Sequence, residues 1–191
     1  MQPSLSSSRL ALRPAQIEDF PYLHGLWSES LVRRYLFDDR YVSLELARSV
    51  LATCLEGRER GTGLWIVQGA GGSARLGCIG LNPTAMVAEA EPRLAGLLEP
   101  VVALHPSHWR QGFAVEALGS VLRYAFETLD QERLAGASDV PNVASARMLE
   151  RLGFVALSEV QGPRYLLRTY LLRREAWHGM QNGGPSSCRS T

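Results

Sequence analysis

Residues 108–114, HWRQGFA, join a short apolar run, VVAL (101–104), to a longer segment with helical periodicity, VEALGSVLRYAFETL (115–129). This pattern predicts a strand followed by a helix. The apolar positions of the helix fall on one face: Val115, Leu118, Val121, Leu122, Ala125, Phe126 and Leu129. Small residues at the junction, Gly112 and Ala114, admit two interpretations. They form a tight turn, or they keep open an anion site on the free N–H groups of the helix start.

The chain has 191 residues and a formal net charge of +1, with average apolar and charged content. These values predict one domain with a full-sized core and argue against a nucleic-acid partner. We find no secretory signal pattern and no apolar run of about 18 residues, so we expect a cytoplasmic protein without a membrane partner. The three cysteines are widely spaced, which indicates neither a disulfide framework nor a metal site.

Toward the N-terminus, alternation predicts a strand at 9–13, a helix from 14 to about 30 and a second helix from 43 to about 58. The runs 63–68 and 75–82 flank GAGGSA and predict a β-hairpin. Its glycine loop leads into a strand and not into a helix, so it does not match the dinucleotide-binding fingerprint.

Residues 83–96 contain two prolines, so we expect an irregular segment there. The remaining pattern predicts strands at 97–105, 133–139, 154–160 and 164–172, and helices at 111–130 and 142–153. From residue 179 the composition is typical of a flexible tail. We therefore expect one domain over 1–178 and a tail over 179–191.

Two segments resemble the GNAT superfamily of acetyl-CoA-dependent N-acetyltransferases, and within it the ribosomal-protein N-terminal acetyltransferase type. The segment 109–114 is similar to the pyrophosphate motif of Gln or Arg, two residues, Gly, one residue, then Gly or Ala. Trp109 departs from that motif but suits the subtype, and Arg110 stands where the subtype commonly has glycine. NVASARMLERLGF (142–154) is similar to the subtype's Asn-x-x-Ser segment that ends in Leu-Gly-Phe.

The resemblance implies a mixed α/β fold, with a central, mostly antiparallel twisted sheet and helices on both faces. It implies a splay between the strand near 97–104 and the strand near 132–138. It also implies acetyl-CoA as cosubstrate, with one amide of residues 102–104 bonding the acetyl carbonyl. The implied coenzyme-binding residues are Val102, Ala103, Leu104, Trp109, Arg110, Gln111, Gly112, Phe113, Ala114, Asn142 and Ser145.

Glu99 is the candidate general base for stripping a proton from the attacking amine. Strand alternation places it on one face with Val101 and Ala103. The neighbouring Pro100 lacks an N–H, which predicts an edge, a bulge or a splay at this point. The sequence departs from the subtype by carrying Val101 where the resembled pattern has glycine. A solvated strand-end carboxylate is the alternative interpretation of Glu99.

Other candidates have competing roles. Glu89 and Glu91, in the preceding loop, are rival bases. Asn142 fits a helix N-cap as well as a coenzyme contact. The position of the superfamily's tyrosine acid holds Leu149 here, so the resemblance implies that the Ser145 hydroxyl, or bulk water, protonates the departing thiolate.

The predicted reaction is direct transfer of acetyl to a primary amine, and the resemblance favours the N-terminal α-amine of a protein. A small amine or aminoglycoside-like antibiotic remains open as the acceptor. A non-catalytic acyl-CoA-binding sensor remains open as an alternative function. A homodimer remains open as the oligomeric state.

Overall fold

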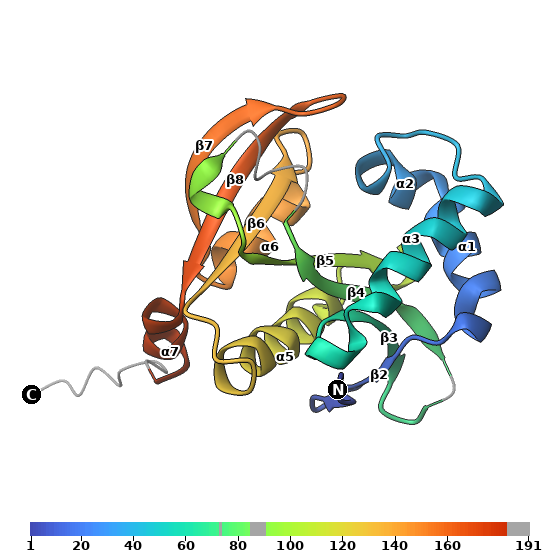
Figure 1. Ribbon diagram of the computed structural model, residues 1–191, viewed down its shortest axis with the longest axis horizontal. Coiled ribbons are helices and arrows are strands. Elements are labelled where there is room, and N and C mark those ends of the chain that lie inside the picture. The colour runs from blue at the N-terminus through green and yellow to red at the C-terminus, as the bar shows by residue number, and fades with distance from the viewer. Residues whose placement is uncertain (73, 85–90, 183–191) are drawn as a thin grey trace, which may run out of the picture.

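The computed structural model describes residues 1–72, 74–84 and 91–182. In these ranges the strands form a single eight-stranded sheet in the order β1-β2-β3-β4-β5-β6-β8-β7 (Figure 1). Neighbouring strands run antiparallel except for β5 and β6, which are parallel. The strands are β1 (Leu5–Ser6), β2 (Leu10–Pro14), β3 (Gly63–Gly69), β4 (Arg75–Pro83), β5 (Leu98–Leu104), β6 (Arg133–Asp139), β7 (Val155–Gln161) and β8 (Leu166–Arg173).

Helices cover both faces of the sheet, as expected. The α-helices are α1 (Phe20–Ser28), α2 (Ser30–Leu36), α3 (Leu44–Glu56), α5 (Phe113–Glu127), α6 (Val143–Arg151) and α7 (Arg174–Asn182). Short 3-10 helices are η1 (Ile17–Asp19), η2 (Arg58–Arg60), η3 (Pro92–Leu94) and η4 (Pro106–His108). Helices α1–α3 lie on one side of β3–β5, and α5 lies on the other (Figure 1).

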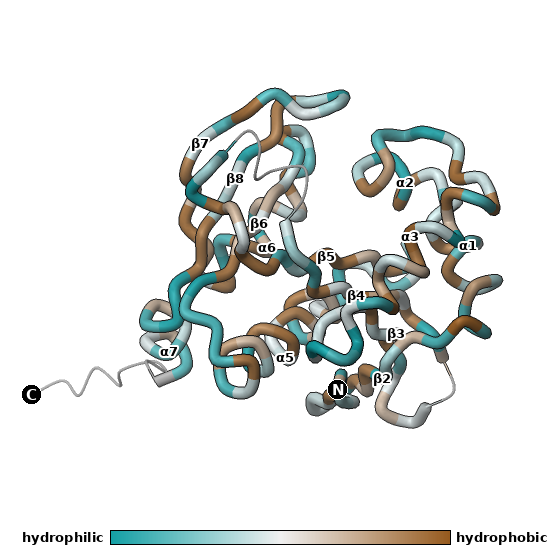
Figure 2. Tube along the Cα trace, in the orientation of Figure 1, coloured by the Kyte–Doolittle hydropathy of each residue, from teal (hydrophilic) through white to brown (hydrophobic). Residues whose placement is uncertain are grey.

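Strand alternation explains this arrangement. In β3, Trp65 and Val67 pack with α5, whereas Leu64 and Ile66 pack with α1–α3. A strand buried on both faces reads as a continuous apolar run, as β3 does. Figure 2 shows hydrophobic positions along the central strands and hydrophilic ones over the α2–α3 connection.

The expected splay between β5 and β6 is present. The two strands pair at a single position, Leu98 with Leu134. Alternate residues of a strand direct their N–H and C=O groups to opposite neighbours, so Pro100 is the next β5 residue that faces β6. Because proline has no N–H to donate, the ladder cannot continue there, and the strands diverge.

Several boundaries differ from expectation. The helix predicted over 14–30 is η1 and α1 instead, and α1 ends at Ser28, because the backbone of the next residue, Glu29, is not helical (φ −58°, ψ 126°). A separate helix, α2, follows. Residues 179–182, predicted as flexible tail, belong to α7, which docks because Trp177 is buried against Phe126. Residues 183–191 lie outside the described residues.

The irregular segment expected at 83–96 contains η3, and its residues 85–90 are outside the described part of the chain. The short strand β1 was not predicted, since two residues carry no periodicity. No helix in the described ranges is both long and apolar enough to cross a membrane.

Candidate active site

The junction between β5 and α5 is an open turn built from two left-handed residues. Arg110 has φ +59° and Gly112 has φ +79°. A glycine adopts this conformation without strain, which explains why the resembled subtype has glycine at the position of Arg110. Trp109, Arg110, Gln111 and Gly112 are exposed, so no other part of the described chain covers this turn.

The start of α5 presents free amides beside this turn. The Glu116 amide bonds the Gly112 carbonyl at 3.1 Å, and the amides of Phe113, Ala114 and Val115 precede that first helical bond. A Cβ added to Gly112 would meet only the Arg9 guanidinium, at 3.4 Å. Amides and helix dipole together favour an anion, so the turn fits the diphosphate that the sequence motif predicts.

Arg9, on the segment leading into β2, brings a positive charge to the same turn. Its guanidinium lies 4.6 Å from the centre of the Phe113 ring and donates to the Gln111 carbonyl at 3.1 Å. It also pairs with Glu116, with 2.6 Å between Nε and Oε2. Burial opposes ionisation of Glu116, but bonds from Ser7 and Arg9 outweigh it and lower its pKa to about 2. Local sequence patterns did not indicate that Arg9 belongs to this site, because it lies about one hundred residues before the turn in the sequence.

The edge of β5 that faces the splay carries two candidate amides. The His105 amide bonds Leu76 of β4, so alternation directs Val102 and Leu104 toward the splay and Ala103 toward β4. The Trp109 indole donates to the Leu104 carbonyl at 2.7 Å. This bond holds the turn against β5 and leaves the Val102 and Leu104 amides facing the gap.

Glu99 lies on the face of the splay that α1–α3 cover, as its alternation with Ala103 predicted. It is half-buried, and burial raises its pKa to about 7, while a hydrogen bond with the backbone of Ala137 partly opposes the shift. The carboxyl of β5 therefore reaches the backbone of β6. A carboxyl with this pKa is suited to general base chemistry near neutral pH.

The rival carboxylate Glu91 differs from Glu99. Glu91 is buried and forms an ion pair with Arg93 at 2.6 Å. Hydrogen bonds from Arg93 and Ser158 lower its pKa to about 2, so Glu91 is a weak base. It anchors η3 to β7 through Ser158. Glu89 lies outside the described residues.

The start of α6 holds Asn142 and Ser145. The Asn142 side chain caps α6 by accepting from the Ser145 amide at 3.2 Å, which is the structural role considered for it. Ser145 is half-buried in the first turn. Because α6 packs into the same core as α5, Ser145 and Glu99 lie on opposite faces of the splay. A base and an acid so placed can serve an attacking group and a leaving group separately.

Comparison with known proteins places this geometry in a family. The acetyltransferase (GNAT) domain family matches residues 9–155. YoaA of Bacillus subtilis (strain 168), named an uncharacterized N-acetyltransferase, is 29% identical over 155 residues, covering 81% of this chain and 84% of its own.

Solved structures share the fold. Spermidine N-acetyltransferase from Vibrio cholerae, in complex with CoA and spermine, has a TM-score of 0.71 at 18% identity, over 90% of this chain and 99% of its own. The ribosomal L7/L12 α-N-protein acetyltransferase RimL, in complex with coenzyme A, has a TM-score of 0.70 at 21% identity, over 89% of this chain and 97% of its own. The ribosomal type is thus a distant structural neighbour, and the likeness extends to the fold alone. The chain belongs to the GNAT acetyltransferase family and is an acetyl-CoA-dependent N-acetyltransferase.

Proposed function

We propose that the acceptor is the N-terminal α-amine of a protein or peptide and that Glu99 is the general base. The observation that carries the proposal is the half-buried Glu99 carboxyl, which reaches across the splay to the backbone of Ala137 and whose pKa burial raises to about 7. An α-ammonium group titrates at about 7.7 to 8.0, so transfer of its proton to Glu99 costs about 1 kcal/mol. A lysine-like ammonium titrates near 10.4, and the same transfer costs roughly 4 to 5 kcal/mol.

Each remaining residue has a role in this proposal. Acetyl-CoA, when bound, supplies the acetyl thioester. The amides of 113–115, together with Arg9, hold its diphosphate. The Val102 or Leu104 amide donates to the acetyl carbonyl, where negative charge develops during attack. Ser145 returns a proton to the departing thiolate, from the face of the splay opposite Glu99.

The neighbouring structures do not decide the acceptor, since one is named for a protein α-amine and another for spermidine. The match between the pKa of Glu99 and that of an α-amine is the support for the choice.

The test is turnover of acetyl-CoA by the full-length protein against matched acceptors, with thiol release and product mass measured together. The acceptors are peptides with a free α-amine, the same peptides blocked at the N-terminus but carrying lysine, spermidine and an aminoglycoside. We expect acetylation of the free α-amine peptides. Acetylation of lysine, spermidine or aminoglycoside alone would refute the acceptor, and coenzyme binding without any turnover would favour a sensor.

A further inference from the structure

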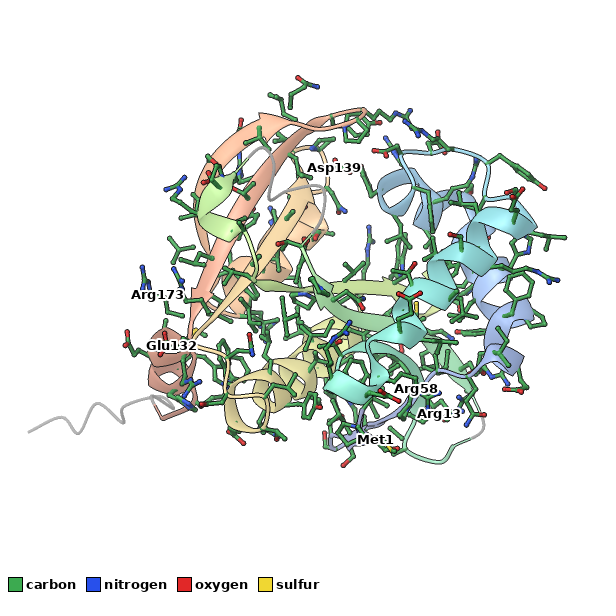
Figure 3. The ribbon with its side chains drawn as sticks, viewed as in Figure 1. Met1, Arg13, Arg58, Glu132, Asp139 and Arg173 are labelled. Carbon is green, nitrogen blue, oxygen red and sulfur yellow. The ribbon has the colours of Figure 1, made fainter. Side chains whose placement is uncertain are left out.

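Glu116, in the first turn of α5, accepts hydrogen bonds from the segment that leads into β2. Its Oε1 atom accepts from the Ser7 hydroxyl at 2.7 Å, the Ser8 hydroxyl at 3.1 Å and the Arg9 amide at 2.9 Å. Its Oε2 atom accepts from Arg9 Nε at 2.6 Å. Figure 3 shows Met1, at the start of the chain, in the lower part of the view with α5, and β1 and β2 both contact this helix. One carboxylate therefore fastens the N-terminal segment to the start of α5.

The charge of Glu116 opposes the binding of an anion at this helix start. With a pKa of about 2, Glu116 is ionised at neutral pH. It directly follows residues 113–115, whose free amides form the anion site. A carboxylate on its own is favourable at a helix N-terminus, but it repels a diphosphate that binds at the same end. The turn can hold a diphosphate well only if a cation balances Glu116.

Arg9 is this cation, and Glu116 holds it in place. Arg9 Nη2 lies 2.5 Å from Glu116 Oε2, and Nη1 donates to the Gln111 carbonyl at 3.1 Å. Nη2 is also the atom that a Cβ on Gly112 would meet, at 3.4 Å. The guanidinium lies 4.6 Å from the centre of the Phe113 ring. These contacts fix the position of the guanidinium beside the turn.

The Arg9 guanidinium keeps donors for a ligand. Arginine has five N–H groups. Those of Nε, one of Nη1 and one of Nη2 are directed to Glu116 and Gln111, so two remain free among the described residues. The Arg9 side chain is 49% exposed and the Glu116 side chain 16%. The carboxylate is thus the inner partner of the pair, and the guanidinium faces solvent at the turn.

We propose that Glu116 is a positioning residue for acetyl-CoA, which orients Arg9 so that its two free N–H groups bond the diphosphate, without itself touching the coenzyme. The inference rests on the proposed function in placing the diphosphate at this turn, and it is independent of the acceptor and of Glu99. A guanidinium that a carboxylate already holds loses less rotamer freedom on binding than a free arginine does.

The test is a double-mutant cycle of Glu116→Gln and Arg9→Ala, with Arg9→Lys as a further variant. Calorimetry measures the affinity for coenzyme A, and displacement of coenzyme A measures the affinity for pantetheine, which lacks the diphosphate. Urea unfolding establishes that each variant is folded. Glu159→Gln is the matched control, because Glu159 forms a similar ion pair with Arg168, at 2.6 Å, on the β7–β8 hairpin.

We expect Glu116→Gln to weaken coenzyme A binding roughly five- to tenfold, because glutamine cannot accept from Arg9 and from the N-terminal segment together. In the Arg9→Ala background the same change only removes a repelling charge, so the affinity should stay unchanged or rise. Arg9→Lys should lose part of the affinity, since an ammonium group lacks the fork of donors. Pantetheine affinity should change less than about twofold throughout, and Glu159→Gln should bind both ligands as the wild type does.

Equal weakening by Glu116→Gln with and without Arg9, or an equal loss for pantetheine, would give Glu116 a structural role only and overturn the inference. Unchanged coenzyme A affinity in folded Arg9→Ala would overturn it as well. If the expected binding pattern is found while no free α-amine peptide is acetylated, the inference stands and the acceptor proposal fails.

Discussion

Replacing Glu99 by glutamine removes one titrating carboxyl and keeps a side chain of similar size. With a pKa of about 7, about a tenth of this carboxyl is ionised at pH 6 and about nine-tenths at pH 8. If the ionised form is the base, wild-type kcat/KM rises across this window. We expect Glu99→Gln to lower turnover by roughly 10² to 10⁴ and to remove the rise that Glu99 contributes.

The same substitution has a measurable effect on stability. Burial raises the pKa of Glu99 from 4.5 to about 7, so the folded state binds its proton more tightly than the unfolded state does. Wild-type stability therefore falls as pH rises through this interval, by roughly 2 to 3 kcal/mol, most of it between pH 5 and 8. Glutamine does not ionise. The free energy of unfolding of Glu99→Gln relative to wild type should rise by that amount over the same range.

Urea unfolding at pH 5, 6, 7 and 8, together with initial rates at saturating acetyl-CoA, measures both effects. Calorimetry with coenzyme A controls for an indirect loss of binding, which should be small. A stability difference that is flat with pH would show that Glu99 is not buried as described. Wild-type rates in the variant across neutral pH would remove it from the reaction.

Three further outcomes are expected. Gly112→Glu should abolish coenzyme binding, because its carboxylate would repel the diphosphate. Gly112→Ala controls for the left-handed backbone and should bind coenzyme A at least about tenfold more tightly than Gly112→Glu does. Equal affinities of the two variants, measured by calorimetry, would contradict the anion site. Ser145→Ala should slow turnover by about 10²-fold or less at unchanged coenzyme affinity, and an unchanged rate would assign the proton to water. Gly119→Ala should stabilise α5 by about 0.5 to 1 kcal/mol in urea unfolding, since a Cβ there meets nothing within 4 Å, and destabilisation would argue against this packing.

Local signals predicted much of the fold. Periodicity placed α3, α5 and α6 and the strands β2 to β8, because each element buries one face or stripe of its own residues. Pro100, whose missing N–H acts at its own position, predicted an edge, a bulge or a splay, and the family resemblance implied the splay that is found. The open turn before α5 was equally readable, since a small residue at Gly112 and a free helix start are properties of a few consecutive residues.

Other features arose only from tertiary contacts. The docking of α7 through Trp177 depends on Phe126, a distant neighbour that no local pattern names. Arg9 joins the anion turn from the other end of the domain.

The sequence by itself indicated the family, the order of strands β2 to β8 with helices α3, α5 and α6, and Glu99 as a candidate base. Only the tertiary structure decided that burial raises the pKa of Glu99 to about 7 and that hydrogen bonds from Arg93 and Ser158 lower the pKa of Glu91. Solvent exclusion and charge pairing depend on which distant segments meet around a group, and residue order alone does not contain that information.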